Sequence, residues 1–261
     1  MFEGADLLVV SHTKSGRTWL RVMLSHLWHL KYGVPADELV RADNLKRLNS
    51  AIPSVHFARD TRFPAETGDL AVGPQQKLLI LFRDPRDVAV SFWFHVRHRA
   101  SEGELERKGI ETAAKELPLY RFVTDPGLGV PRIVRFYNRW LEETRERPRS
   151  ARVRYEDLRR DAGGELRQIT EFLGDSFTPV QIEAAVEFAA FDNLKDKERQ
   201  GYFASGRLGP AEQAAVGEEG AYKVREGSVG GWRQRVTAEE AATIDRLVED
   251  HLDPTLGYSR S

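Results

Sequence analysis

The stretch TKSGRTW, residues 13–19, gathers side chains suited to binding an anion. Its central five residues supply two cations, two hydroxyls and one glycine, namely Lys14, Arg17, Ser15, Thr18 and Gly16. An apolar run precedes it and an amphipathic pattern follows it, so a strand is expected to turn into a helix here. The first turn of a helix has unpaired N–H groups and the positive end of the peptide dipole. We therefore expect a phosphate or sulfate site, with an ordinary turn capped by Ser15 as the alternative.

A second cationic position follows the apolar run KLLILF. Arg83 comes directly after this run, and Asp84 with the proline behind it marks the start of a helix. Arg83 is thus expected at the carboxyl edge of a strand, where open α/β sheets bind their ligands. Ser91 follows about two turns into the helix. The alternative is a surface salt bridge from Arg83 to a neighbouring aspartate.

A third feature is the late stretch VREGSVGGW, residues 224–232, in which three glycines lie between an arginine and a tryptophan. Glycine lets a backbone approach another group closely, so this stretch is expected to fold against the site. A flexible surface loop is the alternative. Trp232 argues against that alternative, because a large aromatic side chain is seldom left exposed.

The composition limits the function classes. The chain has 261 residues, 41% hydrophobic and 30% charged, with a formal net charge of -1. The near-neutral charge argues against binding nucleic acid or a membrane through bulk charge. The absence of cysteine excludes disulfides and thiol catalysis and fits a cytoplasmic location. The run Leu7–Val10 is too short for an integral membrane segment, and His26 with His29 lacks a third ligand, so no metal is expected.

Strands and helices alternate through the first two-thirds of the chain, which predicts one α/β domain over residues 1–261 with a central, mostly parallel sheet flanked by helices. The expected strands are 7–11, 52–57, 77–82 and 151–155. The expected helices are 16–31, one beginning after Arg83, 133–145, 164–173, 180–191 and 238–252. The segment 102–131 is expected to be a lid, a substrate-facing segment or a surface excursion.

Taken together, these motifs resemble the cytosolic-type sulfotransferase family, which uses 3'-phosphoadenosine 5'-phosphosulfate as sulfuryl donor. TKSGRTW looks like the family's P-loop-like 5'-phosphosulfate loop, and LILFRDPRDVAVSFWFH looks like its 3'-phosphate segment. VRYEDL and REGSVGGW resemble two further landmarks in the same order. The similarity extends from Leu7 to about Asp245. The family's C-terminal dimer signature is not legible after Trp232, so a homodimer is left open.

The resemblance implies a role for each matching residue. Lys14 would contact the sulfate and the bridging oxygen. The 5'-phosphate would be held by Ser15, Gly16, Arg17 and Thr18, and the adenosine would be lined by Trp19, Tyr155 and Phe191. The 3'-phosphate would be held by Arg83, Ser91, Arg225 and Gly227. Two positions depart from the family pattern: Arg17 replaces the more usual threonine, and Glu226 stands where a lysine is common.

Sulfuryl transfer is an in-line displacement that needs a cation at the leaving oxygen and a base for the acceptor hydroxyl. Lys14 supplies the cation. His56, in SVHFARD near the end of an expected strand, sits where the family places its base, and a neutral histidine suits that task. His12, His95 and His98 are the alternatives. No metal is required, because lysine and arginine meet the donor's charge.

The acceptor pocket is expected from the least family-like segments, 34–67, 102–131 and 192–222. Their many charged residues favour a glycan, a glycolipid or a small hydroxylated metabolite over a flat phenol. Two other functions are weighed against this one. A P-loop kinase or NTPase needs G-x-x-x-x-G-K-[ST], whereas here Lys14 precedes Gly16. A non-catalytic nucleotide-binding module is disfavoured because Lys14 and His56 are both present.

Overall fold

The computed structural model describes residues 4–36, 45–59, 72–73, 76–203 and 227–258. Its centre is a four-stranded sheet in the order β2-β1-β3-β4, and every neighbouring pair is parallel. The strands are β1 (Leu7–Ser11), β2 (Val55–Arg59), β3 (Lys77–Phe82) and β4 (Ser150–Arg154). The predicted α/β fold with a parallel central sheet is confirmed.

The two inner strands are apolar on both faces, as a parallel sheet covered on both sides requires. Leu8 and Val10 of β1 belong to one hydrophobic cluster, whereas Leu7 and Val9 belong to the other. All four side chains are 0% exposed. Burial of one such side chain contributes about 1.5–3 kcal/mol, so the alternation along β1 stabilises both layers of helices.

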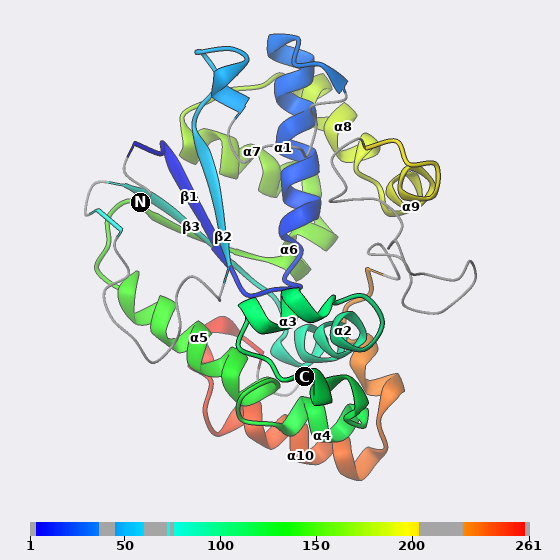
Figure 1. Cartoon of the computed structure of the whole chain (residues 1–261). Coiled ribbons are helices and arrows are strands. Elements are labelled where there is room, and N and C mark those ends of the chain that lie inside the picture. The colour runs from blue at the N-terminus through cyan, green and yellow to red at the C-terminus, as the bar shows by residue number, and fades with distance from the viewer. Residues whose placement is uncertain (1–3, 37–44, 60–71, 74–75, 204–226, 259–261) are drawn as a thin grey trace.

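Helices cover both faces of the sheet (Figure 1). One face carries α1 (Arg17–Tyr32), α7 (Ala162–Leu173), α8 (Pro179–Phe188) and α9 (Phe191–Arg199). The other face carries α2 (Pro85–His98), α4 (Leu119–Thr124), α5 (Val130–Glu143) and α10 (Ala238–Glu249). Shorter elements are η2 (Leu45–Arg47), α3 (Glu102–Arg107), η4 (Thr112–Glu116), α6 (Tyr155–Arg160), η5 (Gly231–Arg235) and η6 (Pro254–Leu256). None of the helices in the described ranges is long and apolar enough to cross a membrane.

The strand order creates a switch point between β1 and β3. After β1 the chain crosses to β2 on one side, and later it returns to β3 on the other side of β1. The loops that follow β1 and β3 therefore leave the same edge of the sheet as neighbours. Such a crevice at the carboxyl ends of the strands is where open α/β sheets bind ligands. The two cationic motifs of the sequence lie on these two loops.

Two expectations about the elements are wrong in detail. The second strand begins at Val55, so His56 is its second residue and does not lie near its end. The helix expected over 180–191 ends at Phe188, because Ala190 has an extended conformation (φ -54°, ψ 145°) and Phe191 starts α9. The segment 102–131, for which no elements were predicted, contains α3, η4 and α4.

Candidate active site

The loop after β1 is shaped to present backbone N–H groups. Gly16 is the N-cap of α1 in a left-handed conformation (φ 96°), and no side chain caps that helix. Ser15 is therefore not the cap, and the alternative of an ordinary capped turn is wrong. Lys14 has φ 75°, and among the described residues it is the one non-glycine with a positive φ. Strained backbone of this kind is concentrated at ligand-binding and catalytic sites.

The side chains of this loop do not all point to one place. Arg17 donates from Nη1 to the Ser11 hydroxyl (3.2 Å) and to the Ala58 carbonyl (3.0 Å), so it ties the carboxyl ends of β1 and β2 together. Ser15 is fully buried, with its hydroxyl 3.4 Å from the Tyr137 hydroxyl. Thr18 lies half-buried in the first turn of α1. In this arrangement the N–H groups at the α1 N-terminus are the part of the loop shaped to bind an anion.

Arg83, which follows β3, connects the loop after β1 to the late stretch. Its Nη1 donates to the Lys14 carbonyl and its Nη2 to the Ser228 carbonyl, each at 3.1 Å. Its guanidinium also lies 4.3 Å from the centre of the Tyr155 ring. The alternative of a surface salt bridge from Arg83 to a neighbouring aspartate is wrong. Asp84 pairs with Arg86 at 2.8 Å, and the Arg83 guanidinium bonds the two carbonyls instead.

Aromatic rings converge beside Arg83. Tyr155 donates to the Gly227 carbonyl (3.1 Å) and meets the Trp19 ring edge-on at 5.8 Å. A Cβ placed on Gly16 would lie 2.6 Å from the Tyr155 ring, and one on Gly227 would lie 2.9 Å from Phe191. Only glycine fits at these two positions. Planar side chains next to a cation and a helix N-terminus suit a ligand with a flat ring and an anionic group.

A buried tyrosine that the sequence analysis did not predict for the site connects the loop after β1 to the loop after β3. Tyr137 of α5 donates to the Arg83 carbonyl (2.8 Å) and accepts from the Arg83 N–H (3.2 Å). The same hydroxyl is the one near Ser15. Burial raises the pKa of Tyr137 well above its ordinary value, so it stays a neutral donor and acceptor. Its place among the apolar residues of the helix predicted a core position. Nothing in the sequence pattern indicated that its hydroxyl would contact the site.

The late stretch is held by one carboxylate. Asp87 of α2 accepts from the N–H groups of Gly230 (2.8 Å) and Trp232 (3.1 Å). Trp232 is 2% exposed, so the expectation that this stretch packs against the protein is confirmed from Gly227 onward. Arg225 and Glu226 lie outside the described residues. Ser91 is half-buried on α2, two turns beyond Asp84.

The histidines separate into different environments. His56 is in register with Leu8, whereas the last residue of β1, Ser11, is in register with Arg59. His56 therefore lies three residues, roughly 10 Å, back from the edge that carries the anion-binding loop.

His12 and His95 both lie on the crevice side. His12 directly follows β1, is 0% exposed, and has Nδ1 3.0 Å from the Thr13 carbonyl oxygen. His95 of α2 has Nε2 3.0 Å from a carboxylate oxygen of Glu104 in α3. His98 is exposed at the end of α2.

The two histidines of α1 lie together. His26 and His29 stack at 5.4 Å, and burial and the neighbouring His29 lower the pKa of His26 to about 4.

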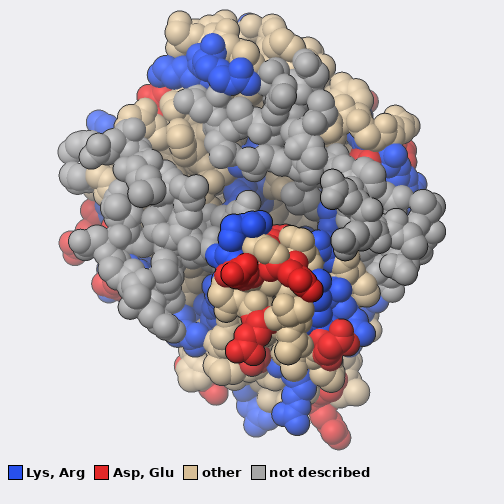
Figure 2. All heavy atoms as spheres, in the orientation of Figure 1, with Lys and Arg blue, Asp and Glu red and all other residues tan. Residues whose placement is uncertain are grey.

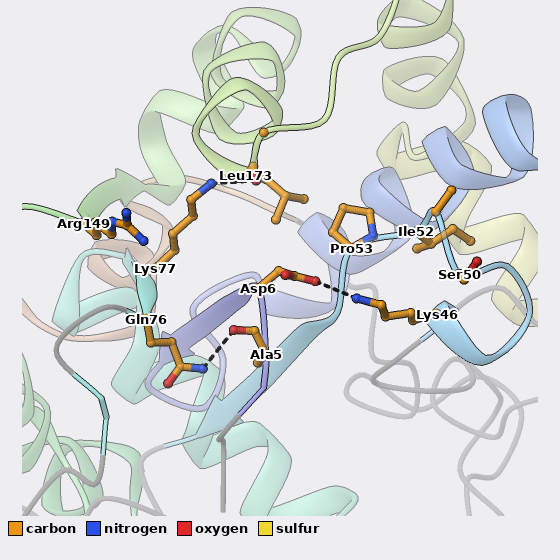
Figure 3. Close-up of a pocket in the computed structure, with 12 residues that line it drawn as sticks. Ala5, Asp6, Lys46, Ser50, Ile52, Pro53, Gln76, Lys77, Arg149 and Leu173 are labelled. Carbon is orange, nitrogen blue, oxygen red and sulfur yellow. Dashed lines mark hydrogen bonds and ion pairs between the residues drawn. The ribbon is translucent and has the colours of Figure 1, made fainter.

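A second hollow lies at the opposite, amino edge of the sheet (Figure 3). It has a volume of about 420 Å³ and lies between the start of β3 and the end of α7. Lys46 pairs with Asp6 at 3.3 Å, and Lys77 donates to the Leu173 carbonyl at 2.8 Å. Lys46 and Lys77 are thus each bound by another group of the protein.

Comparison with known proteins identifies the class. The family model described as "Sulfotransferase domain" matches residues 5–255. Cytosolic sulfotransferase 16 of Arabidopsis thaliana is 27% identical over 96% of this chain and 77% of its own length. Sulfotransferase 2A6 of Mus musculus is 26% identical over 95% of this chain and 84% of its own. The chain belongs to the sulfotransferase domain family and is an enzyme of that class, as the sequence predicted.

Solved structures share the fold. A crystal structure of retinol dehydratase in complex with androsterone and inactive cofactor PAP has a TM-score of 0.62 at 18% identity, covering 94% of this chain and 80% of its own. The structure of mouse sulfotransferase SULT7A1 complexed with PAP has a TM-score of 0.59 at 17% identity, covering 95% and 84%. At these identities the likeness shows a common architecture.

Proposed function

We propose that the protein transfers a sulfuryl group from 3'-phosphoadenosine 5'-phosphosulfate to a hydroxyl acceptor. One observation carries the proposal: Arg83 joins the anion-binding loop after β1 to the late stretch, and aromatic rings lie beside it. A donor with two separated anionic groups and a flat base matches this arrangement. Two structures that share the fold are complexes with PAP, which supports the same donor.

In this proposal the donor's 5' end binds at the α1 N-terminus, where Gly16 admits it closely and Thr18 and Ser15 contribute N–H or hydroxyl groups. Arg17 contributes by fixing the loop, since its guanidinium is bonded to Ser11 and Ala58. Arg83 and Ser91 hold the 3'-phosphate, together with Arg225 and Gly227 of the late stretch, and Glu226 lies between these two residues in the sequence. The adenine lies among the rings of Trp19, Tyr155 and Phe191.

Lys14 stabilises the leaving group. As the S–O bond to the 5'-phosphate breaks, the bridging oxygen gains negative charge, and an ammonium group fixed beside it stabilises the transition state. The backbone of Lys14 is fixed by its left-handed conformation and by the hydrogen bond from Arg83 to its carbonyl. The point from which the Lys14 side chain extends is therefore fixed as well. The reaction requires no change of oxidation state and no metal in this scheme.

The acceptor in this proposal is a small hydroxylated molecule or a glycan or lipid headgroup. The family's relatives include proteins named for a flavonol and for an amine, so acceptors vary among them. Around the anion loop, the segment carrying α3 brings charged side chains, Glu104 and Lys108, against α2. Figure 2 shows acidic and basic side chains side by side on the face that carries α3. A polar acceptor fits this wall better than a flat apolar one.

Thermal-shift titration tests the donor. Adenosine 3',5'-bisphosphate at 100 times its Kd should stabilise the fold by about 2.7 kcal/mol, whereas ATP and GTP at the same concentration should do far less. A larger effect of ATP would favour a nucleotide kinase. Stabilisation by adenosine 3',5'-bisphosphate without transfer of label from the donor to any hydroxyl compound would favour a non-catalytic nucleotide-binding module. Light scattering of the same samples tests whether the chain is a homodimer.

A further inference from the structure

The register of β2 sets His56 three residues back from the carboxyl edge of the sheet, and a second histidine, His95 of α2, is a candidate for the base of the proposed reaction. Ser91 and His95 are four residues apart on α2, so they lie on the same face of that helix one turn apart. Ser91 is assigned to the donor's 3'-phosphate. His95 therefore lies one helical turn beyond Ser91 on the same face of α2.

A carboxylate orients this histidine. His95 Nε2 lies 3.0 Å from Glu104 Oε1, and the two side chains are 16% and 25% exposed. The same carboxylate oxygen is 2.7 Å from the Lys108 ammonium, whose side chain is 5% exposed. The imidazole also lies against the Phe92 ring with a centre-to-centre distance of 6.3 Å. The ring is thus fixed by a hydrogen bond at one nitrogen and by an apolar surface beside it.

The charges around His95 keep its ring neutral. The pKa of His95 is lowered to about 4, chiefly by burial and also by the charges of Lys14 and Lys108, while the bond to Glu104 opposes this shift. The hydrogen bond from His95 and the nearby Lys108 in turn hold the pKa of Glu104 below its usual range. A carboxylate can only accept, so the neutral imidazole donates from Nε2 and keeps its lone pair at Nδ1.

Ring contacts connect His95 to the start of the loop that carries Lys14. The Phe92 ring lies 6.3 Å from the His95 ring and 6.1 Å from the ring of His12, which directly follows β1. The charge of Lys14 is also one of the causes that lower the pKa of His95. His56, by contrast, lies roughly 10 Å back along its strand from the carboxyl edge. His12 is the nearest rival, but it is wholly buried between Phe92 and Phe136.

We propose that His95, positioned by Glu104, is the general base that takes the proton of the acceptor hydroxyl. This inference rests on the proposed sulfuryl transfer. The acceptor oxygen forms a bond to sulfur while the bond from sulfur to the bridging oxygen breaks. The bonding electron pair remains on the 5'-phosphate, and the acceptor proton moves to His95 Nδ1. Glu104 then stabilises the imidazolium that forms, as an orienting carboxylate does in other histidine bases.

Donor binding should strengthen this base. The anionic groups of the donor offset the charge of Lys14, and removing a cation's influence raises the pKa of a neighbouring histidine. The ring is then a weak base in the free enzyme and a stronger one in the donor complex. Proton transfer from the acceptor is thereby favoured only when the sulfuryl group is present.

The first experiment compares three variants, His95→Ala, His56→Ala and His251→Ala, in transfer of labelled sulfate to phenol, glycerol and glucose. His251 is exposed beyond the end of α10 and serves as the matched control. The turnover of His95→Ala should fall by roughly 10²–10⁴-fold, and its affinity for adenosine 3',5'-bisphosphate should stay within about threefold. His56→Ala and His251→Ala should keep wild-type turnover.

The second experiment separates positioning from folding. Glu104 opposes the lowering of the His95 pKa, so Glu104→Gln should shift the acid limb of the kcat–pH profile to lower pH and reduce kcat about tenfold. A purely structural Glu104 would leave that limb in place. The charged groups around His95 are Glu104, Lys108 and Lys14, with Arg99 and its buried partner Glu198 at the end of α2. Lys108→Met should raise the pKa of His95.

Nitrogen NMR of the wild-type protein gives a reading that needs no acceptor. The His95 ring should carry its proton on Nε2, titrate near pH 4 in the free enzyme and titrate at higher pH with the donor analogue bound. A His95→Ala enzyme with at least half the wild-type turnover, or a ring protonated on Nδ1, would overturn the assignment of the base. Failure of the wild-type enzyme to bind adenosine 3',5'-bisphosphate or to transfer label would instead overturn the proposed function.

Discussion

The two edges of the sheet carry similar charges and yet differ in what they can bind. At the carboxyl edge, Lys14 and Arg83 stand at the N-termini of α1 and α2. At the amino edge, Lys46 and Lys77 line the hollow beside the last turn of α7. Both edges have two or more cations within a few residues of a strand end. Only the first is expected to hold an anion.

The polarity of the neighbouring helices makes the difference. A helix N-terminus presents N–H groups and partial positive charge, so a cation placed there adds to the attraction for an anionic ligand. A helix C-terminus presents carbonyl groups, and Lys77 is bonded to one of them at Leu173. The number of cations in a sequence motif therefore predicts an anion site only when the motif also starts a helix.

The sharpest way to break this comparison is Lys14→Ala. Turnover should fall by about 10²–10³-fold, because the ammonium acts on charge that develops in the transition state. Affinity for adenosine 3',5'-bisphosphate should change by less than about fivefold, since that product lacks the sulfuryl group. Steady-state kinetics and isothermal titration measure the two quantities. An unchanged turnover would remove Lys14 from the mechanism.

Removing the cation at the other loop should affect binding more than turnover. Arg83→Ala should weaken the binding of adenosine 3',5'-bisphosphate by roughly 10–100-fold. This is the loss expected for a hydrogen bond to a charged group, which contributes about 1.5–3 kcal/mol. Titration of adenosine 5'-monophosphate beside the bisphosphate isolates the 3'-phosphate contribution. Equal losses for both nucleotides would show that Arg83 acts on loop structure and not on that phosphate.

Tyr137→Phe tests the junction between the two loops with one oxygen atom removed. The hydroxyl bonds both the carbonyl and the N–H of Arg83, so its loss should destabilise the fold by about 1–3 kcal/mol. Affinity for adenosine 3',5'-bisphosphate should fall a few-fold because Arg83 loses its support. Urea unfolding and titration measure the two effects. Phe82→Leu, at a buried neighbour in ring contact with Tyr137, is the control for packing alone.

The smallest effect is expected at the amino edge. Lys77→Met keeps the apolar stem of the side chain and removes the charge that bonds the Leu173 carbonyl. Stability should fall by about 0.3–1 kcal/mol, the usual contribution of a cation at a helix C-terminus. Nucleotide affinity and turnover should match wild type. A loss of nucleotide affinity in this variant would mean that the two edges do not differ as described.

Much of the fold was predictable because its signals are local. The runs that form β1 and β3 have the predicted bounds, Leu7–Ser11 and Lys77–Phe82, since each is a continuous apolar stretch between turn residues. The start of α2 was predictable from Asp84, which accepts from the Arg86 N–H. The order of the motifs identified the family. These features depend on residues close together in the sequence.

The site was predictable only where it depends on such local signals. The position of His56 depends on the register of β2, which pairing with β1 and the bond from Arg17 to Ala58 determine. A short apolar run predicts a strand but not its register. The approach of Glu104 to His95 depends on how α3 packs on α2, and no pattern within 102–131 indicates it. The contacts of the Tyr137 hydroxyl likewise depend on how α5 packs, and the apolar spacing of that helix predicts only a core position.

The left-handed backbone of Lys14 implies a trade between durability and activity. A non-glycine residue in that conformation costs about 1–2 kcal/mol, and this chain keeps it at the residue assigned to the reacting oxygen. Lys14→Gly and Lys14→Ala both remove the ammonium, but the glycine also removes the strain. The glycine variant should therefore unfold at higher temperature than the alanine variant while being equally inactive. Selection for heat tolerance alone would favour losing the residue that the proposed reaction needs.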